Sequence, residues 1–179
     1  MSTLTLILLI IALIVVILLI AAALMKDEYS IERETIINKP KQEVFNYIRL
    51  LKNQVNYNKW TMIDPNAKRE FRGTDGVAGF VFAWDSSNKQ VGKGEQEIKK
   101  ISEGERIDFA LRFIKPFEGN ANASIITESA FGNQTRVKWI FDGIRNYPMK
   151  IMHLVLNLKK ILGRDLQTSL DNLKAVLEK

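Results

Sequence analysis

Apolar residues follow two patterns along the chain, an unbroken run near the N-terminus and an alternating distribution after it. Residues 6–25 read LILLIIALIVVILLIAAALM, which is 20 consecutive apolar side chains. A helix of this length spans about 30 Å, close to the hydrocarbon thickness of a bilayer. The run therefore predicts a single-pass membrane protein with an N-terminal transmembrane anchor, residues 1–28.

Two other interpretations of the run are weaker. A cleaved signal peptide would find small residues at positions 21–23, but the apolar stretch is longer than a usual signal core and no basic residue precedes it. A core helix of a soluble domain would need a polar side, which the run lacks. Lys26, Arg33, Lys39 and Lys41 follow the run, so the positive-inside rule predicts a cytoplasmic position for the rest of the chain.

The next part of the chain is predicted as one strand, two short helices and a series of strands. Residues 29–37 alternate as a strand, and residues 41–51 place Val44, Phe45 and Ile48 on one face of a helix. A second helical piece covers residues 54–62. Alternating segments separated by turn-forming residues then predict antiparallel strands over residues 68–74, 79–84, 91–101, 106–114, 120–129 and 135–143.

Residues 149–179 have the periodicity of one long amphipathic helix. Pro148 suits its first turn, and its apolar face carries Met149, Met152, Leu156, Gly163, Leu166, Leu170, Leu173 and Leu177. A helix that follows a run of antiparallel strands predicts an α+β fold, with a curved sheet of about seven strands wrapped on the helix. Because no linker or repeat interrupts residues 29–179, we expect them to form one domain.

This order of elements, together with local motifs, resembles the helix-grip fold of the START-like SRPBCC superfamily, most nearly its polyketide cyclase/dehydrase and lipid-transport branch. The motifs are INKP at residues 37–40, Trp60, GKGE at residues 92–95, FIKPF at residues 113–117 and TRVKW at residues 135–139. The resemblance covers residues 29–179. It implies a site for a lipid or another apolar ligand and, as in a few family members, catalysis of cyclisation or dehydration. The fold alone does not decide between these activities.

Composition narrows the possible chemistry. The chain has no cysteine, which excludes disulfides and thiolate chemistry, and its one histidine cannot build a metal site, so we expect no metal and no cofactor. The net charge of +6 comes from 26 basic and 20 acidic residues, but the basic residues are scattered, and we expect no nucleic-acid partner. Lys159, Lys160 and Arg164 could instead face anionic lipid headgroups.

Two residues are candidates for acid–base catalysis. Histidine titrates near neutral pH and suits this role, but His153 also fits the edge of the apolar face of its helix. Glu95 shares a strand face with Glu97, and two carboxylates can divide the acid and base roles between them. Lys93 and Lys99 have the same parity, which is typical of a solvated strand face.

Large aromatic and methionine side chains are the strongest indication of a binding site. They either fill a solid core or line a cavity between sheet and helix, and the pattern alone does not separate these alternatives. The predicted cavity lining is Trp60, Phe80, Phe82, Trp84, Phe109, Phe113, Trp139, Phe141, Met149, Met152, His153 and Leu156. Three hypotheses remain: a membrane-anchored module that binds an apolar or lipid-like molecule, a cyclase- or dehydratase-type enzyme using His153 or Glu95, and an interaction module without a ligand.

Overall fold

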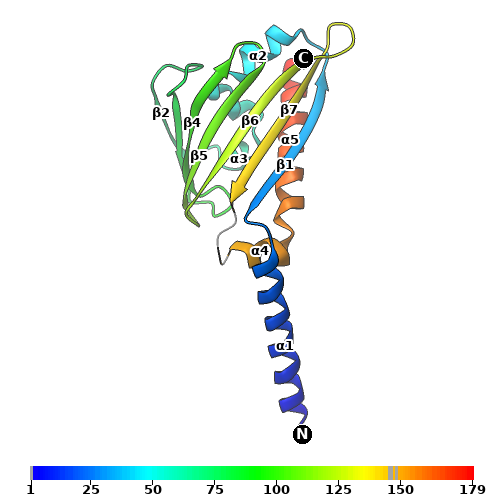
Figure 1. Ribbon diagram of the computed structural model, residues 1–179. Helices are drawn as coiled ribbons and strands as arrows, with labels where there is room; N and C mark the ends of the chain where they lie inside the picture. The colour runs from blue at the N-terminus through cyan, green and yellow to red at the C-terminus, as the bar shows by residue number, and fades with distance from the viewer. Residues whose placement is uncertain (1, 145–146, 148) are drawn as a thin grey trace.

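The computed structural model describes residues 2–144, 147 and 149–179, without the side chains of Met149 and Val155. Within these residues, seven antiparallel strands form one sheet in the order β1-β7-β6-β5-β4-β3-β2 (Figure 1). They are β1 Glu28–Ile37, β2 Lys68–Arg72, β3 Val81–Asp85, β4 Lys93–Ser102, β5 Arg106–Lys115, β6 Gly119–Ser129 and β7 Thr135–Ile144. The predicted antiparallel sheet is confirmed.

Three short helical elements connect β1 to β2, where two were predicted. They are α2 Lys41–Ile48, the 3₁₀ helix η1 Leu51–Asn56 and α3 Lys59–Ile63. The Asp75 carboxylate accepts hydrogen bonds from the backbone N–H groups of Leu51 and Lys52, at 2.8 and 3.2 Å, which holds the start of η1. The Asn58 side chain accepts from the Trp60 N–H at 3.0 Å and caps α3.

The predicted C-terminal helix is present, but it is interrupted at Asn157. Its two parts are α4 Met149–Leu156 and α5 Leu158–Leu177. Asn157 adopts a left-handed conformation with φ 46° and ψ 52°, and its side chain accepts from the Lys160 N–H at 3.3 Å. Asparagine tolerates this conformation better than most residues, so one position starts a new helix in a new direction.

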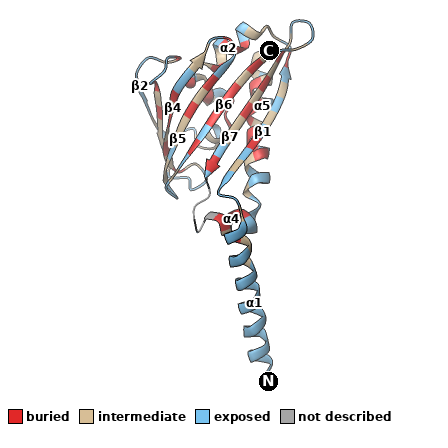
Figure 2. Cartoon of the chain, in the orientation of Figure 1, coloured by how far each residue is buried: buried red, intermediate tan, exposed pale blue. Residues whose placement is uncertain are grey.

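The solid core occupies the half of the sheet's inner face that α2 and α5 cover. Buried side chains of α2 and α5 meet a layer of strand residues there, and Figure 2 shows this burial over the sheet and α5. The main contributors are Val44, Phe45, Ile48, Ile98, Ile107, Phe109, Ile125, Val137, Leu166, Leu170 and Leu173. Gly163 leaves room for the Arg33 side chain between β1 and α5, because a Cβ there would lie 2.3 Å from the Arg33 guanidinium.

Helix α1, Thr3–Leu24, extends away from the sheet and is exposed along almost its whole length (Figure 2). Among the described residues it is the one helix long and apolar enough to cross a membrane, although a signal sequence has the same length and composition. Its C-terminal end contacts α4. The Lys150 ammonium donates to the Met25 carbonyl at 2.9 Å and pairs with Asp27 at 2.5 Å, which ties α4 to the end of α1.

Tyr57 is a buried phenol whose hydroxyl has no hydrogen-bond partner among the described residues. Burial, with smaller contributions from Tyr47 and Asp75, raises the pKa of Tyr57 well above its ordinary value. Its neutral form is therefore strongly preferred in the folded state.

Replacing Tyr57 by Phe is expected to raise the free energy of unfolding by about 1 kcal/mol at neutral pH, because the unpaired hydroxyl is removed from the core. The raised pKa also predicts the direction in which stability changes at alkaline pH. The unfolded chain ionises first above about pH 10, so wild-type stability falls there and part of that fall disappears in Tyr57→Phe. Denaturant titrations at both pH values measure this, with Tyr47→Phe as control, since the Tyr47 hydroxyl accepts from Asn56. Lower stability of Tyr57→Phe at neutral pH would contradict the prediction.

Candidate functional site: an apolar cavity

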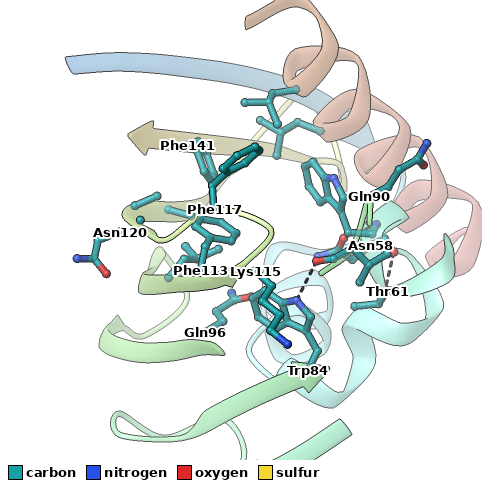
Figure 3. A pocket seen from close by; sticks show the side chains of 18 of the residues that line it. Asn58, Thr61, Trp84, Gln90, Gln96, Phe113, Lys115, Phe117, Asn120 and Phe141 are labelled. Carbon is teal, nitrogen blue, oxygen red and sulfur yellow. Dashed lines mark hydrogen bonds between the residues drawn. The ribbon is translucent and has the colours of Figure 1, made fainter. Parts of the chain in front are cut away.

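A cavity of about 480 Å³ lies between the inner face of the sheet and helices α3, α4 and α5. Figure 3 shows Phe113, Phe117 and Phe141 on one side of it, and Asn58 and Thr61 on the other. The lining includes six aromatic residues of the sheet, Trp60 of α3, and three leucines of α5; these are Tyr29, Phe82, Trp84, Phe113, Trp139, Phe141, Trp60, Leu158, Leu162 and Leu166. All three tryptophans of the chain therefore line the cavity.

The cavity exists because the inner face of the sheet changes character along each strand. On β6, Ile125 belongs to the solid core, Ala123 lies at the boundary of core and cavity, and Ala121 lines the cavity. These alanines lie opposite Phe109 and Leu111 of β5 in register, where larger side chains would fill the space. Helix α2 packs near one end of the sheet only, so small residues at the other end leave room between sheet and helices.

Two aromatic rings of the wall lie flat on the sheet because a glycine is their cross-strand neighbour. A Cβ on Gly94 would lie 2.6 Å from the Trp84 ring, and one on Gly143 would lie 2.5 Å from Tyr29. The Trp84 indole N–H also donates to the Val91 carbonyl at 3.2 Å. The register shift between Lys93 and Gly94 shows that β4 is irregular at this point.

The buried polar groups of the wall are mainly carboxamides. Asn58 accepts from the Trp60 N–H through its side-chain oxygen, so its Nδ2 must be the donor to Gln54 Oε1, at 3.1 Å. Because the Gln54 side-chain oxygen accepts this hydrogen bond, its Nε2 is a donor, and this donor has no partner among the described residues. Gln96 of β4 is 95% buried in the lining, since its exposed fraction is 5%.

Four charged residues are among the lining residues. Asp64 and Arg69 are half-buried, whereas Lys115 and Glu118 are exposed, and so are Gln90, Phe117 and Ile144. These exposed lining residues belong to the β3–β4 connection, the end of β5 with the β5–β6 connection, and the end of β7, at the end of the sheet nearest α1 (Figure 1). The cavity thus opens toward the N-terminal helix, with Lys115 and Glu118 at the mouth and the uncharged amides of Gln54 and Gln96 buried in the wall.

The structure separates the two candidates for acid–base catalysis. His153 of α4 is buried in the cavity wall, with its ring 4.8 Å from the Tyr29 ring between centroids. Glu95 lies on the outer face of the sheet, paired with Arg72 at 2.8 Å and Arg112 at 3.4 Å. Only His153 can meet a molecule in the cavity, because the pleat of β4 directs Glu95 away from it.

Several residues predicted to line the cavity lie elsewhere. Phe80 and Phe109 have the inward parity but belong to the solid core, where α2 and α5 fill the space above them. Met152 of α4 is outside the lining, and Leu156 faces solvent because the Asn157 break turns α4 away from the line of α5. The Met149 side chain is outside the described part of the structure. The other predicted lining residues, namely Trp60, Phe82, Trp84, Phe113, Trp139, Phe141 and His153, are in the wall.

The prediction omitted the small and polar members of the lining. Ala121, Ala123, Gln54, Asn58 and Gln96 carry no aromatic signal. One of them did have a detectable signature, because Gln96 lies between Gly94 and Ile98 at the inward parity of β4. No group of three or more histidine, aspartate or glutamate side chains that could hold a metal occurs among the described residues.

No protein-family model matches the chain, and no curated protein matches its sequence. Solved structures match its fold. The Aha1 dimer from Colwellia psychrerythraea superposes with a TM-score of 0.59 at 14% identity, covering 84% of this chain and 96% of that one. Ara h 8.0201 gives 0.58 at 12% identity, covering 84% and 97%. The di-domain ARO/CYC protein BexL gives 0.61 at 13% identity, covering 90% of this chain and 53% of that one.

These similarities show that the chain has the helix-grip fold, in agreement with the fold predicted from the sequence. At this level of identity they establish the architecture and leave the ligand open.

Gly94→Ala is expected to lower the free energy of unfolding by about 1–3 kcal/mol, as overpacking does in a tight site. The added methyl group would lie 2.6 Å from the Trp84 ring and 2.7 Å from the Arg112 carbonyl, so a strand or the indole must move. Denaturant titration measures the change. Gly119→Ala is the matched control, since its methyl group would meet nothing within 4 Å, and equal stability of the two variants would contradict the prediction.

Proposed function

We propose that the protein is a membrane-anchored binding module that holds an apolar, lipid-like small molecule between the sheet and its C-terminal helices. The observation that carries this proposal is the cavity of about 480 Å³, lined mainly by aromatic and aliphatic side chains. Ligand sites in proteins typically have volumes of about 300–1,000 Å³ with apolar walls and a few polar groups that orient the ligand. A solid interior, as an interaction module without a ligand would have, does not match this arrangement.

The position of polar groups indicates what kind of apolar molecule fits. The deep groups, Gln54 and Gln96, are uncharged, whereas Lys115 and Glu118 lie at the mouth. Gln54 offers a donor, which an uncharged carbonyl, ether or hydroxyl oxygen would accept. Burying a free carboxylate against these amides would cost much more, because an amide carries no charge to neutralise it. We therefore expect a neutral oxygen at the end of the ligand that enters first.

The anchor is supported by the exposure of α1. Its side chains are apolar and mostly uncovered by the rest of the chain, which favours a bilayer as their surroundings. The mouth of the cavity opens toward the same end of the molecule. A ligand that dissolves in the bilayer would reach this mouth most readily.

A cyclase- or dehydratase-type enzyme is the second candidate, and His153 in the cavity wall is the observation that favours it. The ARO/CYC name of BexL, a structural neighbour, points in the same direction. Glu95 cannot take part, because it lies on the outer face. Turnover of a bound polyketide that His153→Asn abolishes without weakening binding would establish this alternative, and identical turnover in both proteins would end it.

Filling the cavity should abolish binding. The probe is a medium-chain methyl ketone with a terminal bromine atom, added to the full chain in lipid nanodiscs; bromine quenches nearby tryptophans, and all three line the cavity. Ala121→Phe should weaken the quenching affinity by about tenfold or more, which corresponds to about 1.4 kcal/mol. Ala110→Phe on the outer face is the matched control. Equal quenching of the two variants would contradict the proposal.

Gln96→Leu should reduce the preference for a ligand oxygen, because it removes one of the two deep amides. We expect the wild type to bind the methyl ketone more tightly than the alkane of equal length by about fivefold, as one neutral hydrogen bond of about 1 kcal/mol would give. In the variant this advantage should be smaller but not absent, since Gln54 Nε2 remains as a donor, and the affinity for the alkane should not fall. Displacement of the brominated probe measures these affinities, and Gln42→Leu, on the exposed side of α2, is the control. An unchanged preference in Gln96→Leu would exclude this role.

A further inference from the structure

Helix α4 has its polar and apolar sides reversed relative to an ordinary surface helix. Its two polar residues with described side chains, Lys150 and His153, are each only 9% exposed. Leu154 and Leu156 are 36% and 50% exposed, although moving apolar side chains out of water is favourable. Lys150 is held inward by Asp27 and the Met25 carbonyl, and His153 by the cavity wall. The outward side of α4 therefore suits apolar surroundings better than water.

Other exposed apolar side chains gather at the same end of the molecule. Phe117 of the β5–β6 connection and Ile144 at the end of β7 line the cavity mouth and are 52% and 60% exposed. The Tyr147 hydroxyl donates to the Leu19 carbonyl of α1 at 3.3 Å, which places this residue beside the helix. We call the set Phe117, Ile144, Tyr147, Leu154, Leu156 and Ile161 the mouth patch. Large exposed apolar side chains gathered around a cavity mouth are typical of an interaction site.

The position of α1 identifies what would cover the mouth patch. The 22 residues of α1 span about 33 Å, so a helix crossing a bilayer would bring its C-terminal end to the lipid headgroups. Tyr147 and Lys150 hold the patch against that end. Lys159, Lys160 and Arg164 are exposed on the first turns of α5, next to the patch in sequence, where anionic headgroups would attract them.

We infer that the mouth patch is embedded in the interfacial layer of the same bilayer that α1 crosses, so that the ligand passes between bilayer and cavity without entering water. This inference rests on the proposed function, since it takes α1 as a membrane anchor. The occupant of the patch is the lipid surface itself. α4 then lies at the interface as an amphipathic helix whose apolar side faces the acyl chains.

The absence of cysteine from the chain allows a direct test with single labels. Phe117→Cys, Leu156→Cys and Phe131→Cys are each labelled with an environment-sensitive nitrobenzoxadiazole dye, in full-length protein inserted in vesicles of phosphatidylcholine and phosphatidylglycerol. Phe131 is the matched control, because it is an apolar residue that is 94% exposed in the β6–β7 connection, at the opposite end of the sheet (Figure 1).

Lipids brominated on their acyl chains should quench the dyes at positions 117 and 156 several-fold more than the dye at position 131. Equal, weak quenching at all three positions would overturn the inference. In a third outcome, the dyes at positions 117 and 156 are protected from water without being quenched by bromine, with a protection that increases with the density of protein in the vesicles. That result would show a second copy of the chain as the occupant and would also overturn the inference.

A transfer experiment separates this inference from the proposed function. Leu154→Asp combined with Leu156→Asp, two residues outside the cavity lining, should slow delivery of the brominated ketone from vesicles to the cavity several-fold, with unchanged equilibrium quenching of the tryptophans, whereas Phe131→Asp should leave the rate unchanged. Binding without any effect on the rate would overturn the inference and leave the proposed function intact. Quenching of the patch dyes by lipid in a protein that never binds the ketone would contradict the proposed function and leave the position of the patch in the bilayer intact.

Discussion

A sheet with one apolar face must have that face covered along its whole length, and the cover here has two unequal halves. Helix α2 and the later turns of α5 press large side chains onto one half and leave no space. Over the other half, α3, α4 and the start of α5 meet Ala121 and Ala123, and a cavity remains. The solid core and the cavity thus share the inner face of the sheet. The size of the side chains along each strand sets the boundary between them.

The junction between α1 and α4 determines how this surface is presented. If α4 continued the line of α5, its leucines would run on past the end of the sheet. The left-handed conformation of Asn157 breaks that line, and Lys150 fixes α4 to the end of α1 through Met25 and Asp27. Two polar interactions and one backbone angle therefore set the direction of the cavity mouth relative to the apolar helix.

Much of the architecture could be predicted from the sequence, because alternation of apolar residues determines which side of each strand faces inward. The same pattern could not separate Phe80 from Phe82, since both have the inward parity and both pack in the core, and only Phe82 also lines the cavity. The sequence pattern did not predict the break at Asn157 either. A single residue can adopt the left-handed conformation without changing the spacing of the apolar residues around it. Gln54 and Gln96 were missed because a search for large apolar rings passes over amides.

The outermost strand has a further consequence for neighbouring molecules. β2 ends the sheet order, and of its five residues only Phe71 is apolar, beside Lys68, Arg69, Glu70 and Arg72. Phe71 faces inward, stacked on Phe82 with ring centroids 5.1 Å apart. Confinement to a membrane plane would crowd many copies together, where strands at sheet edges readily join into extended sheets. A short edge strand with four charged side chains, three of them basic, opposes such joining and would help to keep the domains separate.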